Sequence, residues 1–290
     1  MTTASQWLAG ARPRTLPLAV CPVLVGTAAA TTHHFSFGWW KMALAGVVAL
    51  SLQVGVNYAN DYSDGVRGVD RHRRGPTRLT AGGLASPVAV RRAAFISFAL
   101  AGVAGLVLAM AVDWRLLLVG GLCVAGAWFY SGGRRPYGYA GYGELAVLFF
   151  FGFVATVGSA YVQIHGVPEV AWWASLVVGL GAAAVLVANN LRDIDSDRMA
   201  NKRTLAVRLG SAATARLFVA LLVGAFVAVV PIGFGHPGAF MALLALPLAV
   251  QPVKTVLRGA DAPSLVRAMV GTVRLVAVMA LALTIGLVVG

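Results

Sequence analysis

Apolar segments of about 20 residues recur along the whole length of this 290-residue chain. An α-helix of that length spans the hydrocarbon core of a bilayer, because each residue adds about 1.5 Å. The chain is 59% hydrophobic and 11% charged, whereas soluble domains average roughly 45–50% and about 25%. The sequence therefore predicts an all-α integral membrane protein rather than a soluble one.

We expect a single domain over residues 1–290 that forms a bundle of nine transmembrane helices around a central cavity opening to the cytoplasmic loops. No soluble domain is evident between the apolar segments. The eighth segment is the least regular, because Pro247 and Pro252 interrupt it. The 34 glycines favour close helix packing in lipid. The expected spans are residues 16–34, 39–62, 92–112, 114–131, 143–164, 170–190, 213–233, 238–255 and 268–289.

The basic residues predict how this bundle is oriented. Of the 23 Lys and Arg residues, only Lys41 and Arg115 fall on the side opposite to the N-terminus, and Arg274 lies inside the ninth span. Loops rich in Lys and Arg stay in the cytoplasm. We therefore expect a multi-pass protein of the cell membrane with a cytoplasmic N-terminus and an extracytoplasmic C-terminus. We expect no nucleic-acid partner, because no soluble module displays the net charge of +13.

The first of two acidic segments, NDYSDGVRGVD, ends the second span. If the helix continues, Asn57, Asp61 and Asp64 lie at i, i+4 and i+7 and share one face. Asn60 lies beside them along the chain, and the role of Asp70 stays open. In a chain this hydrophobic, carboxylates that gather at the end of a span indicate that they bind a ligand.

The second acidic segment, NNLRDIDSDR, ends the sixth span on the same predicted side of the membrane. Asn189, Asp193 and Asp197 lie at i, i+4 and i+8, again on one helix face. Asn190 precedes the acids, and the role of Asp195 stays open. Two helix ends would then present carboxylate and amide oxygens to a shared cavity.

A cation would relieve the repulsion between these carboxylates, which would otherwise tend to protonate. Ligand sets made only of oxygen suit Mg²⁺, which shares its coordination with substrate phosphates. Basic residues follow both acidic segments, and acids that hold a metal beside bases make a site for a diphosphate. The alternative is a set of surface ion pairs, each worth ~0–1 kcal/mol. The predicted metal ligands are Asn57, Asn60, Asp61, Asp64, Asn189, Asn190, Asp193 and Asp197.

Five stretches resemble the UbiA superfamily of intramembrane aromatic prenyltransferases, and within it the 1,4-dihydroxy-2-naphthoate prenyltransferases of menaquinone synthesis. NDYSDGVRGVD and RDIDSDRMANKRTLAVRLG are similar to the two aspartate motifs of the superfamily. ARPRTLPLAVCPVLVG, GPTRLTAGGLAS and YSGGRRPYGYAGYGELAVLFFFG are similar to stretches of the naphthoate branch. One departure is the wider spacing of Asp64 and Asp70, which puts a ligand role of Asp70 in doubt.

The resemblance implies a nine-helix fold and a Mg²⁺-dependent enzyme that works in the lipid bilayer. Its expected reaction transfers a polyprenyl group from polyprenyl diphosphate to 1,4-dihydroxy-2-naphthoate, with loss of diphosphate and CO₂, giving demethylmenaquinol. The resemblance implies that the catalytic residues are Asp61, Asp64, Asp193 and Asp197. The expected diphosphate-binding residues are Arg67, Arg78, Lys202 and Arg203.

The carboxylate of the acceptor needs a cationic partner. Arg14 heads the first span, and Arg274 lies within the ninth. A charge at that depth costs ~2.5–3.5 kcal/mol, so we expect Arg274 to face the bundle interior. Its alternative role is a structural anchor. Tyr139, in the segment YGYAGYG, completes the predicted acceptor-binding set.

Two other classes of protein fit less well. A CDP-alcohol phosphotransferase motif also begins D-x-x-D-G, as at Asp61 to Gly65, but the residues that should follow are missing and the second acidic pair lies far along the chain. A transporter would place acids near the bilayer midplane on broken helices. Most acids here lie at one rim of the membrane instead.

Overall fold

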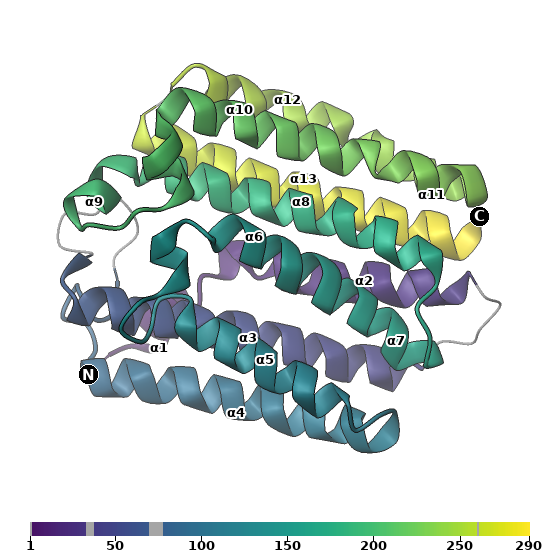
Figure 1. Cartoon of the computed structure of the whole chain (residues 1–290), viewed down its shortest axis with the longest axis horizontal. Coiled ribbons are helices and arrows are strands. Elements are labelled where there is room, and N and C mark those ends of the chain that lie inside the picture. The colour runs from purple at the N-terminus through teal and green to yellow at the C-terminus, as the bar shows by residue number, and fades with distance from the viewer. Residues whose placement is uncertain (1, 33–37, 70–77, 260) are drawn as a thin grey trace.

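The computed structural model describes residues 2–32, 38–69, 78–259 and 261–290. All regular secondary structure in these ranges is helical. Long helices lie side by side along the longest axis of the molecule (Figure 1). Asp70 falls outside the described residues.

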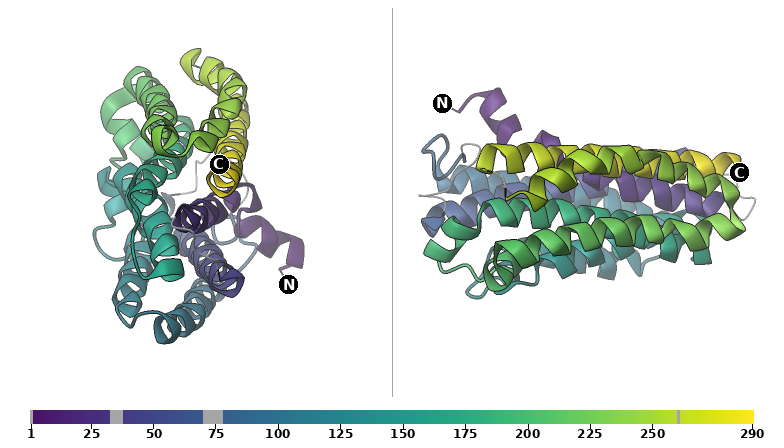
Figure 2. Two further views of the ribbon diagram at one scale, coloured as in Figure 1. Left: turned by 90° about the vertical axis from the view of Figure 1, so that its right-hand side faces the viewer. Right: turned by 90° about the horizontal axis from the view of Figure 1, so that it is seen from above.

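The helices follow the apolar segments of the sequence closely. The view along the bundle shows α2, in dark purple, near its middle (Figure 2). The main elements are α1 (Ala4–Gly10), α2 (Pro17–Thr31), α3 (Trp39–Val66), α4 (Pro87–Ala111), α5 (Leu116–Phe129), η3 (Tyr137–Ala140), α6 (Gly143–Val147), η4 (Leu148–Val157), α7 (Gly158–Ile164), α8 (Glu169–Arg192), α9 (Ile194–Met199), α10 (Leu205–Val227), α11 (Val229–Gly235), η5 (Pro237–Ala245), α12 (Leu246–Leu257) and α13 (Ala262–Val289).

The described helices make this a multi-pass membrane protein. Seven of them are long and apolar enough to cross a bilayer, or eight if the bent pair Ala4–Thr15 and Pro17–Thr31 forms one span. The fourth predicted span is α5, which is apolar but only 14 residues long. The predicted count of nine is therefore close to the observed count but is not reached by length and hydropathy.

The bundle is held together by close contact between helices with small side chains. The main core cluster consists largely of Ala, Val and Leu from α2, α8, α10 and α13. Gly152 of η4 faces α8, where a side chain on Gly179 would lie 2.8 Å from the Gly152 Cα atom. Apolar side chains gain little by leaving lipid for protein, so this tight packing supplies much of the association between helices.

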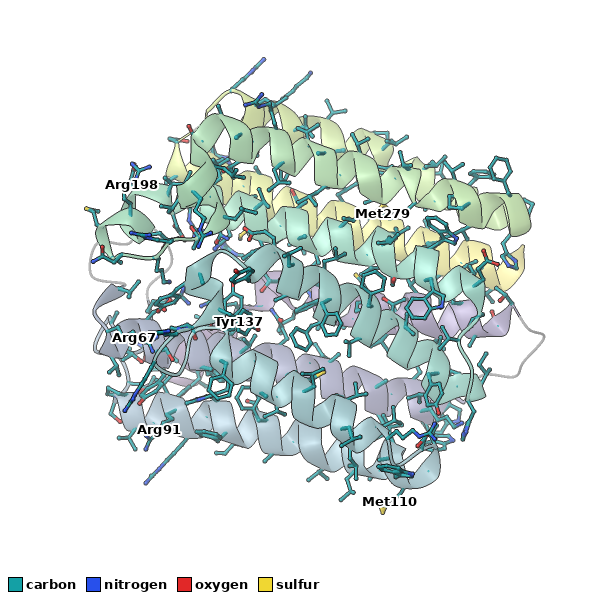
Figure 3. The ribbon with its side chains drawn as sticks, viewed as in Figure 1. Arg67, Arg91, Met110, Tyr137, Arg198 and Met279 are labelled. Atoms are coloured by element: carbon teal, nitrogen blue, oxygen red, sulfur yellow. The ribbon has the colours of Figure 1, made fainter. Side chains whose placement is uncertain are left out.

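The two acidic segments lie at the same end of the bundle, as the sequence predicts. α3 and α8 both run toward that end, on the left of Figure 1, where α9 follows α8. Arg67 follows α3 and Arg198 belongs to α9, and both lie at this end in Figure 3, whereas Met110 of α4 lies at the other.

Candidate functional site

A cavity of about 1240 Å³ lies inside the bundle. Helices α2 to α8 supply most of its walls, with apolar side chains such as Val48, Phe98 and Val154 along much of them. The polar lining comes from the ends of α3 and α8 and the segments beside them. The predicted site residues that line the cavity are Arg14, Asn57, Asn60, Asp61, Asp64, Arg78, Tyr139, Asn189, Asn190, Asp193, Asp197 and Lys202.

The polar residues near the end of α3 bind neighbouring segments as well as facing the cavity. Asn57 donates from Nδ2 to the carbonyl oxygen of Ala11 at 2.9 Å. The Asp61 carboxylate accepts two backbone hydrogen bonds, from Leu79 at 2.9 Å and from Thr80 at 2.8 Å. Both polar side chains are buried. The helical spacing found in the sequence thus places them on the face of α3 that meets the cavity.

One lysine joins the two acidic segments across the site. The Lys202 ammonium lies 3.1 Å from the Asp64 carboxylate and 3.9 Å from that of Asp197. The Tyr139 hydroxyl donates to Asp64, and Lys202 Nζ lies 4.5 Å from the centre of the Tyr139 ring. Burial and the neighbouring Asp64 charge raise the pKa of Tyr139 above its usual 10.0. The phenol therefore remains a neutral donor.

Local backbone geometry brings Lys202 to this position. α9 ends at Met199, and Asn201 adopts a left-handed conformation with φ 56°. The chain then turns back, so that the Lys202 amide donates to the Asp197 carbonyl at 2.9 Å. Thr204 caps α10, and its hydroxyl lies 3.5 Å from the Asp197 carboxylate.

The end of α8 carries a second polar network. Arg192 forms a 2.5 Å ion pair with Asp193 and donates to the Asn189 side chain at 2.9 Å. Asn190 donates to the buried Glu144 carboxylate at 2.9 Å. These bonds fix amide and carboxylate oxygens at the wall of the cavity. Asp195 is exposed and is not among the lining residues.

Three predicted cations lie away from the cavity in this structure. Arg67 donates to the backbone carbonyls of Ser131 and Gly133. Arg203 is exposed. Arg274 is also exposed, on the outer face of α13, so the prediction that it faces the bundle interior is wrong.

Other polar residues of the site were not predicted. Ser131 donates to Asn60 at 2.6 Å, and Thr204 contacts Asp197. Both lie in stretches that carry the family resemblance, but neither was assigned a role from the sequence. Arg12 lines the cavity with its backbone in the left-handed region, at φ 57° and ψ 63°. Non-glycine residues in that region often mark functional sites, but sequence alone does not reveal a dihedral angle.

The oxygen donors suit a magnesium ion that is shared with a substrate. Among the described residues, no group of three or more His, Cys, Asp and Glu side chains is placed to hold a metal alone. Mg²⁺ is usually bound by one or two carboxylates together with substrate phosphates and water. Asp64 and Asp197, which share one ammonium partner, provide such a pair.

Comparison with known proteins gives a consistent result. The model of the UbiA prenyltransferase family matches residues 19–276. A 1,4-dihydroxy-2-naphthoate octaprenyltransferase of Mycobacterium tuberculosis is 50% identical over 259 residues, which cover 89% of this chain and 88% of that protein. The Escherichia coli protein of the same name is 38% identical over 272 residues, covering 88% and 86%.

Solved structures share the fold at low sequence identity. A UbiA homolog from Aeropyrum pernix superposes with a TM-score of 0.70 at 15% identity, covering 92% of this chain and 97% of that one. A UbiA homolog from Archaeoglobus fulgidus bound to GPP and Mg²⁺ gives 0.64 at 14% identity, covering 96% and 99%.

Proposed function

Since the chain belongs to the UbiA prenyltransferase family, we propose that it transfers a polyprenyl group from polyprenyl diphosphate to 1,4-dihydroxy-2-naphthoate. Diphosphate and CO₂ leave, and the product is demethylmenaquinol. The sequence similarity to two octaprenyltransferases of this name supports the choice of acceptor.

The observation that carries the proposal is the junction of two acidic segments beside a large apolar cavity. Lys202 contacts Asp64 of α3 and Asp197 of α9, which are far apart in the sequence. A prenyl diphosphate has the matching character, because its head is strongly anionic and its tail is apolar. The polar end then binds the head, and the apolar walls bind the tail.

We assign the metal to the oxygens of the two acidic segments. A bound Mg²⁺ would neutralise charge on the diphosphate as the leaving group departs. Asp61 and Asp193 lie at the same wall but already accept hydrogen bonds in this structure. The proposed ligands are the eight predicted residues Asn57, Asn60, Asp61, Asp64, Asn189, Asn190, Asp193 and Asp197.

Arg78 and Lys202 are the best-supported diphosphate contacts, because both line the cavity. Negative charge grows on the bridging oxygen as the allylic C–O bond breaks, and fixed cations stabilise it most in that state. Arg67 and Arg203, the other two predicted diphosphate contacts, are not among the residues that line the cavity.

The acceptor is bound by the remaining polar lining. Arg14 lines the cavity and is our proposed partner for the naphthoate carboxylate, whereas Arg274 lies on the outer face. Tyr139 lies at the junction of Asp64 and Lys202. The electron pair of the C–O bond leaves with the diphosphate, and the electron-rich naphthoate ring attacks the allylic carbon. Loss of the carboxyl group as CO₂ then restores the aromatic ring.

The experiment that tests this function is a product assay on the purified protein in lipid. It contains a polyprenyl diphosphate, Mg²⁺ and 1,4-dihydroxy-2-naphthoate, with 4-hydroxybenzoate in a parallel reaction. We expect diphosphate and a prenylated naphthoquinol to appear together, and both to be lost with EDTA. Turnover with the benzoate alone would refute the proposed acceptor, and no product with either would refute the proposed reaction.

We place the protein in the cell membrane, with the polar end of the cavity and the N-terminus in the cytoplasm. The distribution of Lys and Arg along the sequence supports this orientation.

A further inference from the structure

The segment at residues 78–85 packs closely on the end of α3. Its turns are closed by internal backbone hydrogen bonds, including those from Leu84 and Ala85 to the Leu79 carbonyl at 2.9 and 3.0 Å. Leu79 is only 2% exposed and belongs to a small core cluster with Tyr58 of α3. The first residue of this segment, Arg78, lines the cavity.

Asp61 holds the segment at a fixed distance from α3. One of its carboxylate oxygens accepts a hydrogen bond from the Leu79 amide, and the other accepts one from the next amide, that of Thr80. Hydrogen bonds to an ionised acceptor are stronger than neutral ones. The two donors, Leu79 and Thr80, follow Arg78 directly in the chain. The two hydrogen bonds therefore determine the position of the Arg78 backbone at the cavity.

Two glycines permit the close approach. A Cβ atom on Gly65 of α3 would lie 2.5 Å from Thr80 Cβ, and one on Gly10 of α1 would lie 2.6 Å from Leu79 Cδ1. Real Cβ atoms do not come so close to their neighbours, so alanine at Gly65 would force the segment away, whereas alanine at Gly10 would require the Leu79 side chain to shift. Glycine at position 65 therefore lets the Leu79 and Thr80 amides reach the Asp61 carboxylate.

We infer that Asp61 and Gly65 form a seat for residues 78–85 and that this seat positions Arg78 for the diphosphate. The inference rests on the proposed function, because it takes Arg78 as a diphosphate contact. In this view Asp61 has two tasks, as a proposed metal ligand and as the anchor of a cation-bearing segment. Gly65 is a positioning residue that touches neither substrate nor metal.

Gly65→Ala tests the seat without changing any proposed ligand. We expect the apparent KM for polyprenyl diphosphate to rise on the order of 10-fold, the effect of weakening one charge-assisted hydrogen bond, while the KM for the naphthoate stays unchanged. Gly46→Ala is the matched control on the same helix, because a Cβ atom added to Gly46 would meet no neighbouring atom within 4 Å. An equal effect of Gly46→Ala would overturn the inference.

A double-mutant cycle shows whether Gly65 acts through Arg78. Independent positions give additive effects, whereas positions that share one interaction do not. We expect Gly65→Ala to add nothing to the KM of Arg78→Ala. We also expect Thr80→Gly, which removes the clashing side chain, to recover part of the loss in Gly65→Ala. The inference would be overturned if the effects of Gly65→Ala and Arg78→Ala on KM were additive, or if Thr80→Gly did not recover part of the loss.

If Gly65→Ala does not give monodisperse protein, Leu79→Ala replaces it in the cycle, since it loosens the segment without a clash. The same lack of additivity with Arg78→Ala is expected. Failure of the proposed function is distinguishable, because the unmodified protein would then form no prenylated naphthoquinol. Normal turnover with additive effects would refute only the seat.

Discussion

Tyr139 connects the proposed catalytic groups at the scale of single residues. Its hydroxyl donates to Asp64, and its ring faces the Lys202 ammonium. Tyr139→Phe removes the donor and keeps the ring. We expect turnover to fall about 10-fold or more, because a hydrogen bond to a charged group is worth ~1.5–3 kcal/mol. The measurement is kcat with both substrates saturating.

The pH dependence of that variant follows from the raised pKa of Tyr139. Burial and the Asp64 charge favour the neutral phenol, so the hydroxyl stays protonated up to its usual pKa of 10.0 and beyond. The ratio of wild-type to Tyr139→Phe activity should therefore be constant from pH 7 to pH 10. A ratio that falls toward 1 with a midpoint at pH 10 would show that the phenol ionises with its usual pKa.

The sequence predicted where the acidic residues lie better than it predicted which groups they contact. Helical spacing placed Asn57, Asp61 and Asp64 on one face, and all three line the cavity. The same spacing does not show that Asp61 accepts two amides from a segment 18 and 19 residues later. The sequence shows that Arg274 lies inside the ninth span, but it does not show which face of α13 meets lipid. The prediction that Arg274 faces the interior was wrong for that reason.

At the scale of helices, Gly26 controls how α2 meets the π-helix η4. A Cβ atom there would overlap the Thr156 carbonyl oxygen and lie 2.9 Å from Ser159 Cβ. We expect Gly26→Ala to destabilise the protein by about 1–3 kcal/mol, as overpacking does. The measurement is the thermal midpoint in detergent.

Gly158→Ala is the control for this prediction, because a Cβ atom added to Gly158 would meet no neighbouring atom within 4 Å. Both changes replace a helical glycine and remove the same backbone freedom. Only the contacts differ, so a lower midpoint in Gly26→Ala alone is expected. Equal midpoints would mean that α2 and η4 can separate without loss of stability.

The apolar segments predicted where helices occur, but not whether each helix is of the α, 3₁₀ or π type. The second span continues as helix into the first acidic segment and ends at Val66, so Asn57, Asp61 and Asp64 lie in one helix, as predicted. The eighth was expected to be irregular, and it begins as a 3₁₀ helix, η5, before α12 starts at Leu246 with Pro247 in its first turn. The π-helical hydrogen bonding of η4 has no signature in its run of Leu, Phe and Val.

At the scale of the whole molecule, the uneven charge distribution predicts which end is cytoplasmic. Arg198 and Arg115 are both exposed. Arg198 lies at the left-hand end of the bundle in Figure 3, whereas Arg115 precedes α5 directly and follows the end of α4, where Met110 is labelled at the other end. With the natural cysteines Cys21 and Cys123 replaced by alanine, a cysteine at Arg198 should react with a membrane-impermeant maleimide only after cells are opened. A cysteine at Arg115 should react in intact cells. The opposite pattern would reverse the proposed orientation.

Lys202 is a counter-ion for both acidic segments that the chain itself supplies. Its ammonium lies between Asp64 and Asp197, where it offsets the charge that a metal would otherwise neutralise. A metal alone must compete with this lysine, whereas a metal that arrives with diphosphate offers the lysine a new anionic partner. We therefore expect thermodynamic linkage, in which each ligand raises the affinity for the other. Equal Mg²⁺ affinity with and without diphosphate would contradict it. Such reciprocity would keep the acids from holding stray cations when no prenyl donor is present.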